Sequence, residues 1–172
     1  EPSLAQQREP MHDAVNDNPP GWFARRIWLG GAIAASLLLP DRLSRDLQEQ
    51  AGISLPDYEI LVYLSEAPEK RLRMSELADR TLSSRSRLSH QVDRLTDAGL
   101  VDRQPCSDDR RGYFAVLTPQ GLDYLVKTAP VHVGSVREHL VDILTPEEFA
   151  EFGRLCAKVA DRLLPPAGGD CG

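Results

Sequence analysis

The residues of this sequence that are best suited to chemistry lie on one face of a predicted helix after Ser84. Serine is a favoured N-cap residue, and Leu88, Val92 and Leu95 recur at i, i+4 and i+7, which predicts one apolar stripe. The opposite face is rich in hydrogen-bond donors and carries Arg85, Ser86, Arg87, Ser89, His90 and Arg94. A helix needs such donors to meet phosphates and base edges, although a charged helix face is often simply solvated. The spacing therefore predicts an amphipathic helix that could contact nucleic acid.

A β-hairpin is predicted directly after this helix. Gly99 suits the left-handed position that ends a helix, and residues 100–103 and 113–117 are typical of strands. The loop between them, residues 105–112, is rich in turn-forming and charged side chains. Residues 71–73 are a candidate third strand. Upstream of the Ser84 helix, the pattern predicts a short helix and a tight turn that would complete a helix-turn-helix.

The short helix is expected over residues 76–80, with Ser75 as its cap, and the turn over residues 81–83. A helix pair that leads into a basic hairpin is a winged helix-turn-helix. The fold class expected is therefore mainly α with a small β-hairpin wing.

Longer helices are predicted on both sides of this region. Residues 22–51 carry apolar side chains on more than one face, so they need several buried sides, and Pro40 should kink the helix. Thr118 and Pro119 are the expected start of a helix that Pro130 should kink or break before it continues to Leu144, with Val126 facing inward. Beyond Thr145, a capping box leads into a heptad-like apolar seam of Phe149, Phe152, Cys156, Val159 and Leu163. Such surfaces suit packing between two subunits.

Several motifs in this region resemble those of the MarR family of transcriptional regulators. The run Asp109-Arg110-Arg111-Gly112, four mostly apolar residues, Leu117-Thr118 and then Gly121 is similar to the wing signature of that family. The segments 92–95 and 99–101 resemble the end of its recognition helix. The similarity covers about residues 22–164, and the motifs occur in the expected order. Two departures are Gln91, where an aliphatic residue is common, and Cys106 in the wing.

The resemblance implies roles for individual residues in binding double-stranded DNA. It directs Ser84, Ser86, Arg87, Ser89 and His90 toward the major groove, with Arg87 as the candidate for a bidentate guanine contact. Arg85 and Arg94 are expected on phosphates. Arg110 and Arg111 would enter a narrow minor groove, and Asp109 would orient one of them. The alternative for this tip is a charged hairpin without a partner.

Family members commonly bind small phenolic or anionic effectors between the dimerisation helices and the DNA-binding lobe. The candidates for such a pocket are Arg26, Trp28, Tyr58 and Tyr63. An aromatic residue at helical spacing is more often plain core, and Arg26 could equally lie in solvent. Cys106 could act as a redox switch, but an inert exposed thiol is the simpler expectation. A metal site of His132, His139 and Cys156 has no dense ligand cluster to support it, so no cofactor is expected.

The charge distribution is compatible with DNA binding although the net charge is −6. Ten basic and eight acidic residues lie between Glu69 and Arg111, so this segment carries +2, whereas the remainder carries −8. A locally basic face on an acidic protein is sufficient for DNA binding, because the electrostatic field at the contact surface determines the attraction to phosphates. Three scattered cysteines and the lack of a secretory signal pattern favour a reducing cytoplasm. The longest apolar run, residues 27–39, is too short to span a membrane.

The expected molecule is a homodimeric, cytoplasmic DNA-binding regulator, most simply a repressor, that binds a palindromic operator and is released by a small aromatic or anionic effector. Its expected organisation is a loosely attached segment, 1–21; a dimerisation region, 22–53 and 119–164; a DNA-binding lobe, 54–118; and a flexible tail, 165–172. The alternatives are a winged-helix module that binds protein, or a redox-responsive regulator that uses Cys106. No nucleophile motif, phosphate-binding loop or metal-ligand spacing indicates an enzyme.

Overall fold

The computed structural model of the 172-residue chain describes the backbone of residues 21–106 and 112–163, and the side chains of these segments from Gly30 onward. Its contacts divide the chain into two compact units, residues 1–41 and 42–172. In the described segments, no helix is both long and apolar enough to cross a membrane.

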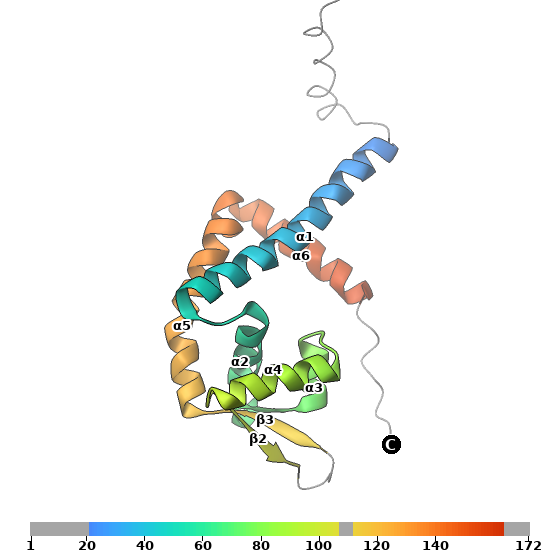
Figure 1. Ribbon diagram of the computed structural model, residues 1–172. Helices are drawn as coiled ribbons and strands as arrows, with labels where there is room; N and C mark the ends of the chain where they lie inside the picture. The colour runs from blue at the N-terminus through green and yellow to red at the C-terminus, as the bar shows by residue number, and fades with distance from the viewer. Residues whose placement is uncertain (1–20, 107–111, 164–172) are drawn as a thin grey trace, which may run out of the picture. The chain divides into compact units, whose positions relative to one another are not determined.

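The described chain is mainly helical with one small antiparallel sheet (Figure 1). The sheet has the strand order β1-β3-β2, and the β2–β3 hairpin is the predicted wing. The winged helix-turn-helix fold is therefore confirmed. The elements are α1 (Gly21–Ala51), α2 (Leu55–Glu66), η3 (Pro68–Lys70), β1 (Arg71–Arg73), α3 (Met74–Arg80), α4 (Arg85–Asp97), β2 (Val101–Pro105), β3 (Tyr113–Leu117), α5 (Pro119–His139), η4 (Val141–Ile143) and α6 (Pro146–Leu163).

The helix starts follow from side-chain caps that replace missing backbone partners. Ser54, Ser84 and Thr118 each accept a hydrogen bond from the backbone three residues later. Thr145 and Glu148 cap α6 reciprocally, as the capping box predicts. The predicted Ser75 cap is wrong: α3 begins at Met74 without a side-chain cap, because β1 stays paired with β3 as far as Arg73 and leads straight into the helix.

The two internal prolines do not interrupt their helices. α1 continues through Pro40 and α5 through Pro130, so a break at Pro130 is excluded, whereas the kinks predicted at Pro40 and Pro130 stay predictions. Pro130 and Val126 both lie on an exposed face of α5, and Val126 is 65% exposed instead of facing inward. Water can therefore hydrate the Val126 carbonyl that lacks a proline N–H donor. α5 ends at His139, and a short 3-10 turn replaces the predicted continuation to Leu144.

The core lies between α2, α3, α4 and the inner face of the sheet. Its largest fully buried side chains come from α1, α2, α3, α4 and β2: Leu47, Ile60, Leu61, Leu64, Leu77, Leu88, Val92 and Val101. The predicted apolar stripe of α4 is thus confirmed as buried. α4 buries this stripe and Gln91, so most of its polar face stays outside.

A polar cluster joins the C-terminal part of α1 to α5. The Ser135 hydroxyl donates to Asp46 Oδ2 over 2.6 Å, and His139 Nε2 lies 3.0 Å from the same oxygen. Arg42 Nε lies 3.4 Å from Asp46 Oδ1 and 3.2 Å from His139 Nε2. The Ser135 hydrogen bond, with smaller help from His139 and Arg42, lowers the pKa of Asp46 although burial opposes this. The carboxylate is therefore kept charged at the helix junction.

The first turn of α5 packs closely against Leu100, in the segment between α4 and β2, and this approach requires glycine at position 121. A Cβ atom there would lie 2.1 Å from the Leu100 carbonyl oxygen and 2.8 Å from Leu117 Cδ1. Gly134, in the same helix, is exposed, and a Cβ there would meet no described atom within 4 Å apart from its chain neighbours and the backbone of its own helix.

We expect Gly121→Ala to lower the free energy of unfolding by about 1–3 kcal/mol or more, because backbone must move to relieve the clash. Gly134→Ala, the matched control, should raise it by about 0.5–1 kcal/mol through helix propensity. Urea denaturation at one protein concentration measures both. Equal stability of Gly121→Ala and the wild type would contradict the close approach.

Candidate nucleic-acid interface

α4 exposes a short row of polar side chains on a rigidly held helix. Leu88, Gln91, Val92 and Leu95 are buried beneath it. Ser86, Arg87 and His90 are exposed, as the sequence predicts for the polar face. This row could enter a groove of nucleic acid as a unit.

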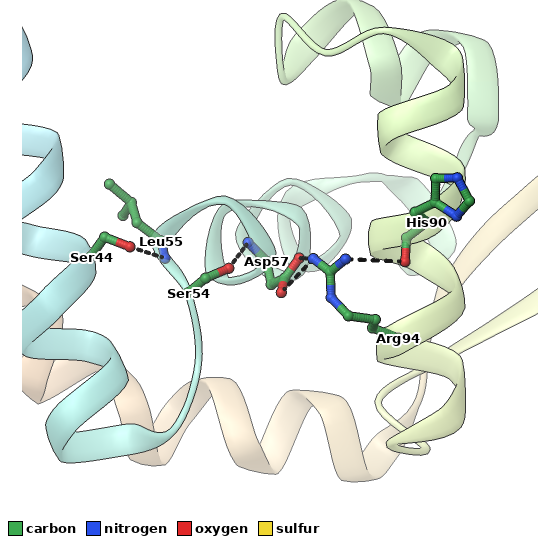
Figure 2. A network of polar contacts seen from close by, with 6 residues as sticks. All are labelled: Ser44, Ser54, Leu55, Asp57, His90 and Arg94. Atoms are coloured by element: carbon green, nitrogen blue, oxygen red, sulfur yellow. Dashed lines mark hydrogen bonds and ion pairs between the residues drawn. The ribbon is translucent and has the colours of Figure 1, made fainter.

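One clamp on α4 is an ion pair with α2 (Figure 2). Arg94 Nη2 donates to both carboxylate oxygens of Asp57, over 2.8 and 3.0 Å, and Nη1 lies 3.5 Å from the His90 carbonyl. Asp57 is itself fixed, since its backbone N–H donates to Ser54 Oγ. The Asp57 carboxylate is nearly buried, whereas Arg94 is more than half exposed. Arg94, predicted on a phosphate, is thus engaged inside the protein.

A second clamp ties α4 to the wing strand β2. Arg103 Nη2 donates to both the carbonyl and the hydroxyl oxygen of Ser89 at 3.0 Å, and it lies 2.9 Å from Asp93 Oδ1. Ser89 is consequently half-buried against the strand and differs from the exposed Ser86. The two clamps act on opposite flanks of α4 and fix its rotation.

Asp57 and Arg103 hold α4 in place, and the sequence pattern did not indicate them. Strand alternation offers a signal for Arg103, because it lies two residues after the buried Val101 and opposite the buried Ala115. A charged side chain at an inward position needs a partner. No comparable local signal links Asp57 to Arg94, which is 37 residues away.

The remaining arginines of α4 have no acidic partner among the residues that the structure describes. These are Arg85 and Arg87, and both are exposed. Arg94 and Arg103 form the ion pairs instead. Two positive charges are therefore available to an external anion on the exposed face of α4.

Polar recesses flank α4 on both sides. One, of about 530 Å³, lies toward the wing and is lined by Arg73, Ser75, Arg85, Ser89, Arg103 and Cys106 among others. The other, of about 650 Å³, lies toward the start of α2 and is lined by Ser44, Ser54, Ser84, Arg87, His90 and Gln91 among others. Gln91 is buried, and its Oε1 has no hydrogen-bond partner within the described chain. α4 thus forms a ridge between two concave surfaces, a shape that suits a grooved ligand.

The base of the wing is closed by a hydrogen bond from the Cys106 N–H to the Gly112 carbonyl. The predicted exposed thiol is wrong, because Cys106 is only 6% exposed where it packs below the wing-side recess. The predicted tip residues Asp109, Arg110 and Arg111 lie outside the described residues. Their expected groove contact stays a prediction.

The predicted effector residues are not brought together at one described site. Tyr58 is buried in the core with its ring centroid 4.8 Å from that of His132, and burial raises the pKa of Tyr58 and lowers that of His132. Tyr63 is half-buried, and the side chains of Arg26 and Trp28 lie outside the described part. In the described segments, no three His, Cys, Asp or Glu side chains could hold a metal ion.

Known proteins share this arrangement and much of its sequence. Residues 51–112 match the model of the MarR family. AbsC, a MarR family transcriptional regulator from Streptomyces coelicolor, is 45% identical over 81% of this chain and 94% of its own, with a TM-score of 0.76. The chain belongs to the MarR family. The family resemblance indicated by the sequence is therefore confirmed, and its members are transcriptional regulators, not enzymes.

Two further relatives extend the comparison. Sco3205, a MarR family transcriptional regulator from Streptomyces coelicolor, was solved in complex with DNA; it is 44% identical over 84% of this chain and 91% of its own, with a TM-score of 0.79. The transcriptional repressor YetL from Bacillus subtilis is 27% identical over 112 residues, which are 65% of this chain and 66% of that protein. Of these two relatives of the MarR-family regulator, one was therefore solved bound to DNA and the other is named a repressor.

The Arg94–Asp57 clamp leads to a test of stability. We expect Arg94→Ala to lower the free energy of unfolding by about 1–2 kcal/mol, because it leaves a nearly buried carboxylate without its partner, with the value reduced by the exposure of Arg94. Arg87→Ala, on the same helix, should change it by less than about 0.5 kcal/mol. Urea denaturation of both at equal protein concentration provides the comparison. An equal loss in the two variants would show that the pair does not stabilise the fold.

Proposed function

We propose that this MarR-family regulator binds double-stranded DNA as a homodimer on an inverted-repeat operator and represses transcription until a small effector releases it. The observation that supports DNA binding is that some arginines at α4 form internal ion pairs whereas others stay exposed. Arg94 and Arg103 form internal ion pairs with Asp57 and Asp93, whereas Arg87 is exposed without an acidic partner in the described chain. The DNA complex of the relative Sco3205 supports the same function.

Direct readout is assigned to the exposed row Ser86, Arg87 and His90, with Ser84 at the start of the helix. An arginine can donate two parallel hydrogen bonds to the O6 and N7 atoms of guanine, so Arg87 is the main specificity residue in this proposal. Arg85 contacts the backbone. Ser89 and Arg94 are assigned to holding α4 in place, given their internal partners. Asp109, Arg110 and Arg111 keep their predicted role in the minor groove.

The proposed dimer uses apolar surfaces that the single chain leaves exposed. On α6 the predicted seam is open to solvent: Phe149, Phe152, Val159 and Leu163 are 40–77% exposed. On α1, Ile33, Leu37 and Leu38 are 50–67% exposed. Large apolar side chains of this kind usually mark an interface. A two-fold axis between them would set two α4 helices about 34–36 Å apart, the spacing of successive major grooves.

The repressor role is supported by the name of the relative YetL. An aromatic or anionic effector would act by favouring a helix spacing that does not fit DNA, which requires a difference in affinity between two states. Arg26, Trp28, Tyr58 and Tyr63 remain its predicted contacts. The buried Tyr58 would need its surroundings to open before it met a ligand. The cytoplasmic location stays a prediction.

DNA recognition is tested by fluorescence anisotropy with the duplex that flanks the protein's own gene and a scrambled duplex at one salt concentration. Arg87→Ala should weaken operator binding by about 10- to 100-fold and relax the preference for the operator, because a bidentate base contact is lost. Arg137→Ala is the control, since Arg137 is paired with Asp142 at the end of α5. Wild-type protein that binds both duplexes equally would refute sequence-specific binding, and salt-insensitive capture of a protein would favour an interaction module.

The dimer is tested by sedimentation equilibrium, with the expectation that the wild type has twice the 19.1 kDa mass of the chain. Val159→Glu should shift the population to monomer, because it places a charge in the apolar seam of α6. Lys158→Glu changes more charge on the same exposed helix but lies off the seam, so it should leave the dimer intact. A monomeric wild type, or equal dissociation of both variants, would contradict the proposed interface.

A further inference from the structure

The recess between α4 and the start of α2 contains a buried hydrogen-bond acceptor that has no donor. Gln91 lines this recess of about 650 Å³, the residue is only 4% exposed, and its Oε1 has no hydrogen-bond partner within the described chain. A buried amide oxygen that leaves water without gaining a donor destabilises the fold. The folded protein therefore gains nothing from this acceptor, which indicates a role for it in the bound state.

Helix geometry makes Arg87 a neighbour of this acceptor. Arg87 precedes Gln91 by four residues, so their side chains lie next to each other on one face of α4, and both line the recess. Side chains of a helix lean toward its N-terminus, which directs the Gln91 amide back toward Arg87. The terminal torsion of glutamine is soft, so that rotation about χ3 turns Oε1 toward the recess. The Arg87 guanidinium can therefore donate to Oε1 from the recess side.

Among the arginine and histidine side chains that line the recess, only Arg87 is available to this acceptor. Arg94 Nη2 donates to both carboxylate oxygens of Asp57 (Figure 2). His90 directly precedes Gln91, and consecutive residues of a helix do not face each other. The Arg87 guanidinium, by contrast, is exposed and has no hydrogen-bond or ion-pair partner among the residues that the structure describes. Arg87 is therefore the donor that the recess offers.

One guanidinium has enough donors for a base and for the glutamine at the same time. Arginine carries five N–H donors, and a bidentate contact with guanine O6 and N7 uses two of them. A third can donate to an acceptor of the protein. Arginine also loses much rotamer freedom when it is fixed on a base, and an acceptor that favours the bound orientation lowers this entropy cost.

We propose that Gln91 is the positioning residue for Arg87, an inference that rests on the proposed DNA-binding function. As α4 enters the major groove, Arg87 donates one N–H to Gln91 Oε1 and presents two others to guanine O6 and N7. Both contacts require the same orientation of the guanidinium, so each favours the other. Gln91 thereby increases the preference of Arg87 for guanine without touching a base.

Gln91→Met tests this role, because methionine has nearly the shape of glutamine but offers no amide acceptor. Full-length wild type, Gln91→Met, Arg87→Ala and the double variant are titrated by fluorescence anisotropy with the duplex that flanks the protein's own gene and with a scrambled duplex. Gln91→Met should weaken binding to the first duplex by about five- to tenfold and leave binding to the scrambled duplex unchanged. In the Arg87→Ala background the same substitution should have no further effect, since the two residues act as a pair.

Two further measurements separate positioning from a merely structural role. The slope of log K against log salt should stay at the wild-type value in Gln91→Met, because no charge is lost. The melting temperature of this variant should rise by about 2–4 °C, because an unpaired buried acceptor is removed, so stability increases while specificity decreases. Gln120→Met is the control: Gln120 is an exposed glutamine of α5 that does not line the recess, and its variant should keep the wild-type affinity and preference.

Equal weakening by Gln91→Met in the wild-type and Arg87→Ala backgrounds would overturn the positioning role. A lower melting temperature of Gln91→Met would overturn it as well, because Oε1 would then have a partner in the free protein. If Gln91→Met keeps the preference for the operator while Arg87→Ala loses it, the DNA-binding function stands and the role of Gln91 fails. If the wild type binds both duplexes equally, the proposed function fails first, so the two failures are distinguishable.

Discussion

The exposed face of α4 depends on the contact of Arg94 Nη2 with both carboxylate oxygens of Asp57. An apolar stripe buries one side of α4, but burial is non-directional and would tolerate small rotations or shifts of the helix. A short ion pair to α2 on one flank, and the Arg103 contacts to Ser89 and Asp93 on the other, are directional and remove that freedom. A reading helix that is ordered before it meets its ligand avoids part of the entropy cost of binding.

Arginine serves two opposite purposes within a few residues of each other. Where a carboxylate lies in reach, as for Arg94 and Arg103, the guanidinium becomes part of the scaffold. Where the described chain supplies none, as for Arg85 and Arg87, the charge remains directed outward. The acidic net charge of the chain does not prevent this, because Asp57 and Asp93 are neutralised by internal pairs.

Local signals in the sequence predicted most of the fold. The caps at Ser54, Ser84, Thr118 and Thr145 depend on neighbours only three residues away, and each is confirmed. Contacts between distant segments escaped prediction, including the pairing of Arg94 with Asp57 and the burial of Cys106. Whether Pro130 breaks its helix could not be decided from the sequence for a related reason, since the cost of a proline within a helix depends on whether water reaches the carbonyl that loses its partner. Exposure of that kind is a property of the folded molecule.

At the junction of α1 with α5, one ring nitrogen of His139 has two hydrogen-bond partners of opposite kind. His139 Nε2 lies within hydrogen-bond reach of Arg42 Nε–H, which needs a lone pair, and of the Asp46 carboxylate, which needs a proton. One nitrogen cannot satisfy both at once. In one tautomer Nε2 accepts from Arg42, and in the other it donates to Asp46. Because both partners belong to α1, either tautomer ties the two helices together, and the Ser135 hydroxyl adds a further tie through Asp46.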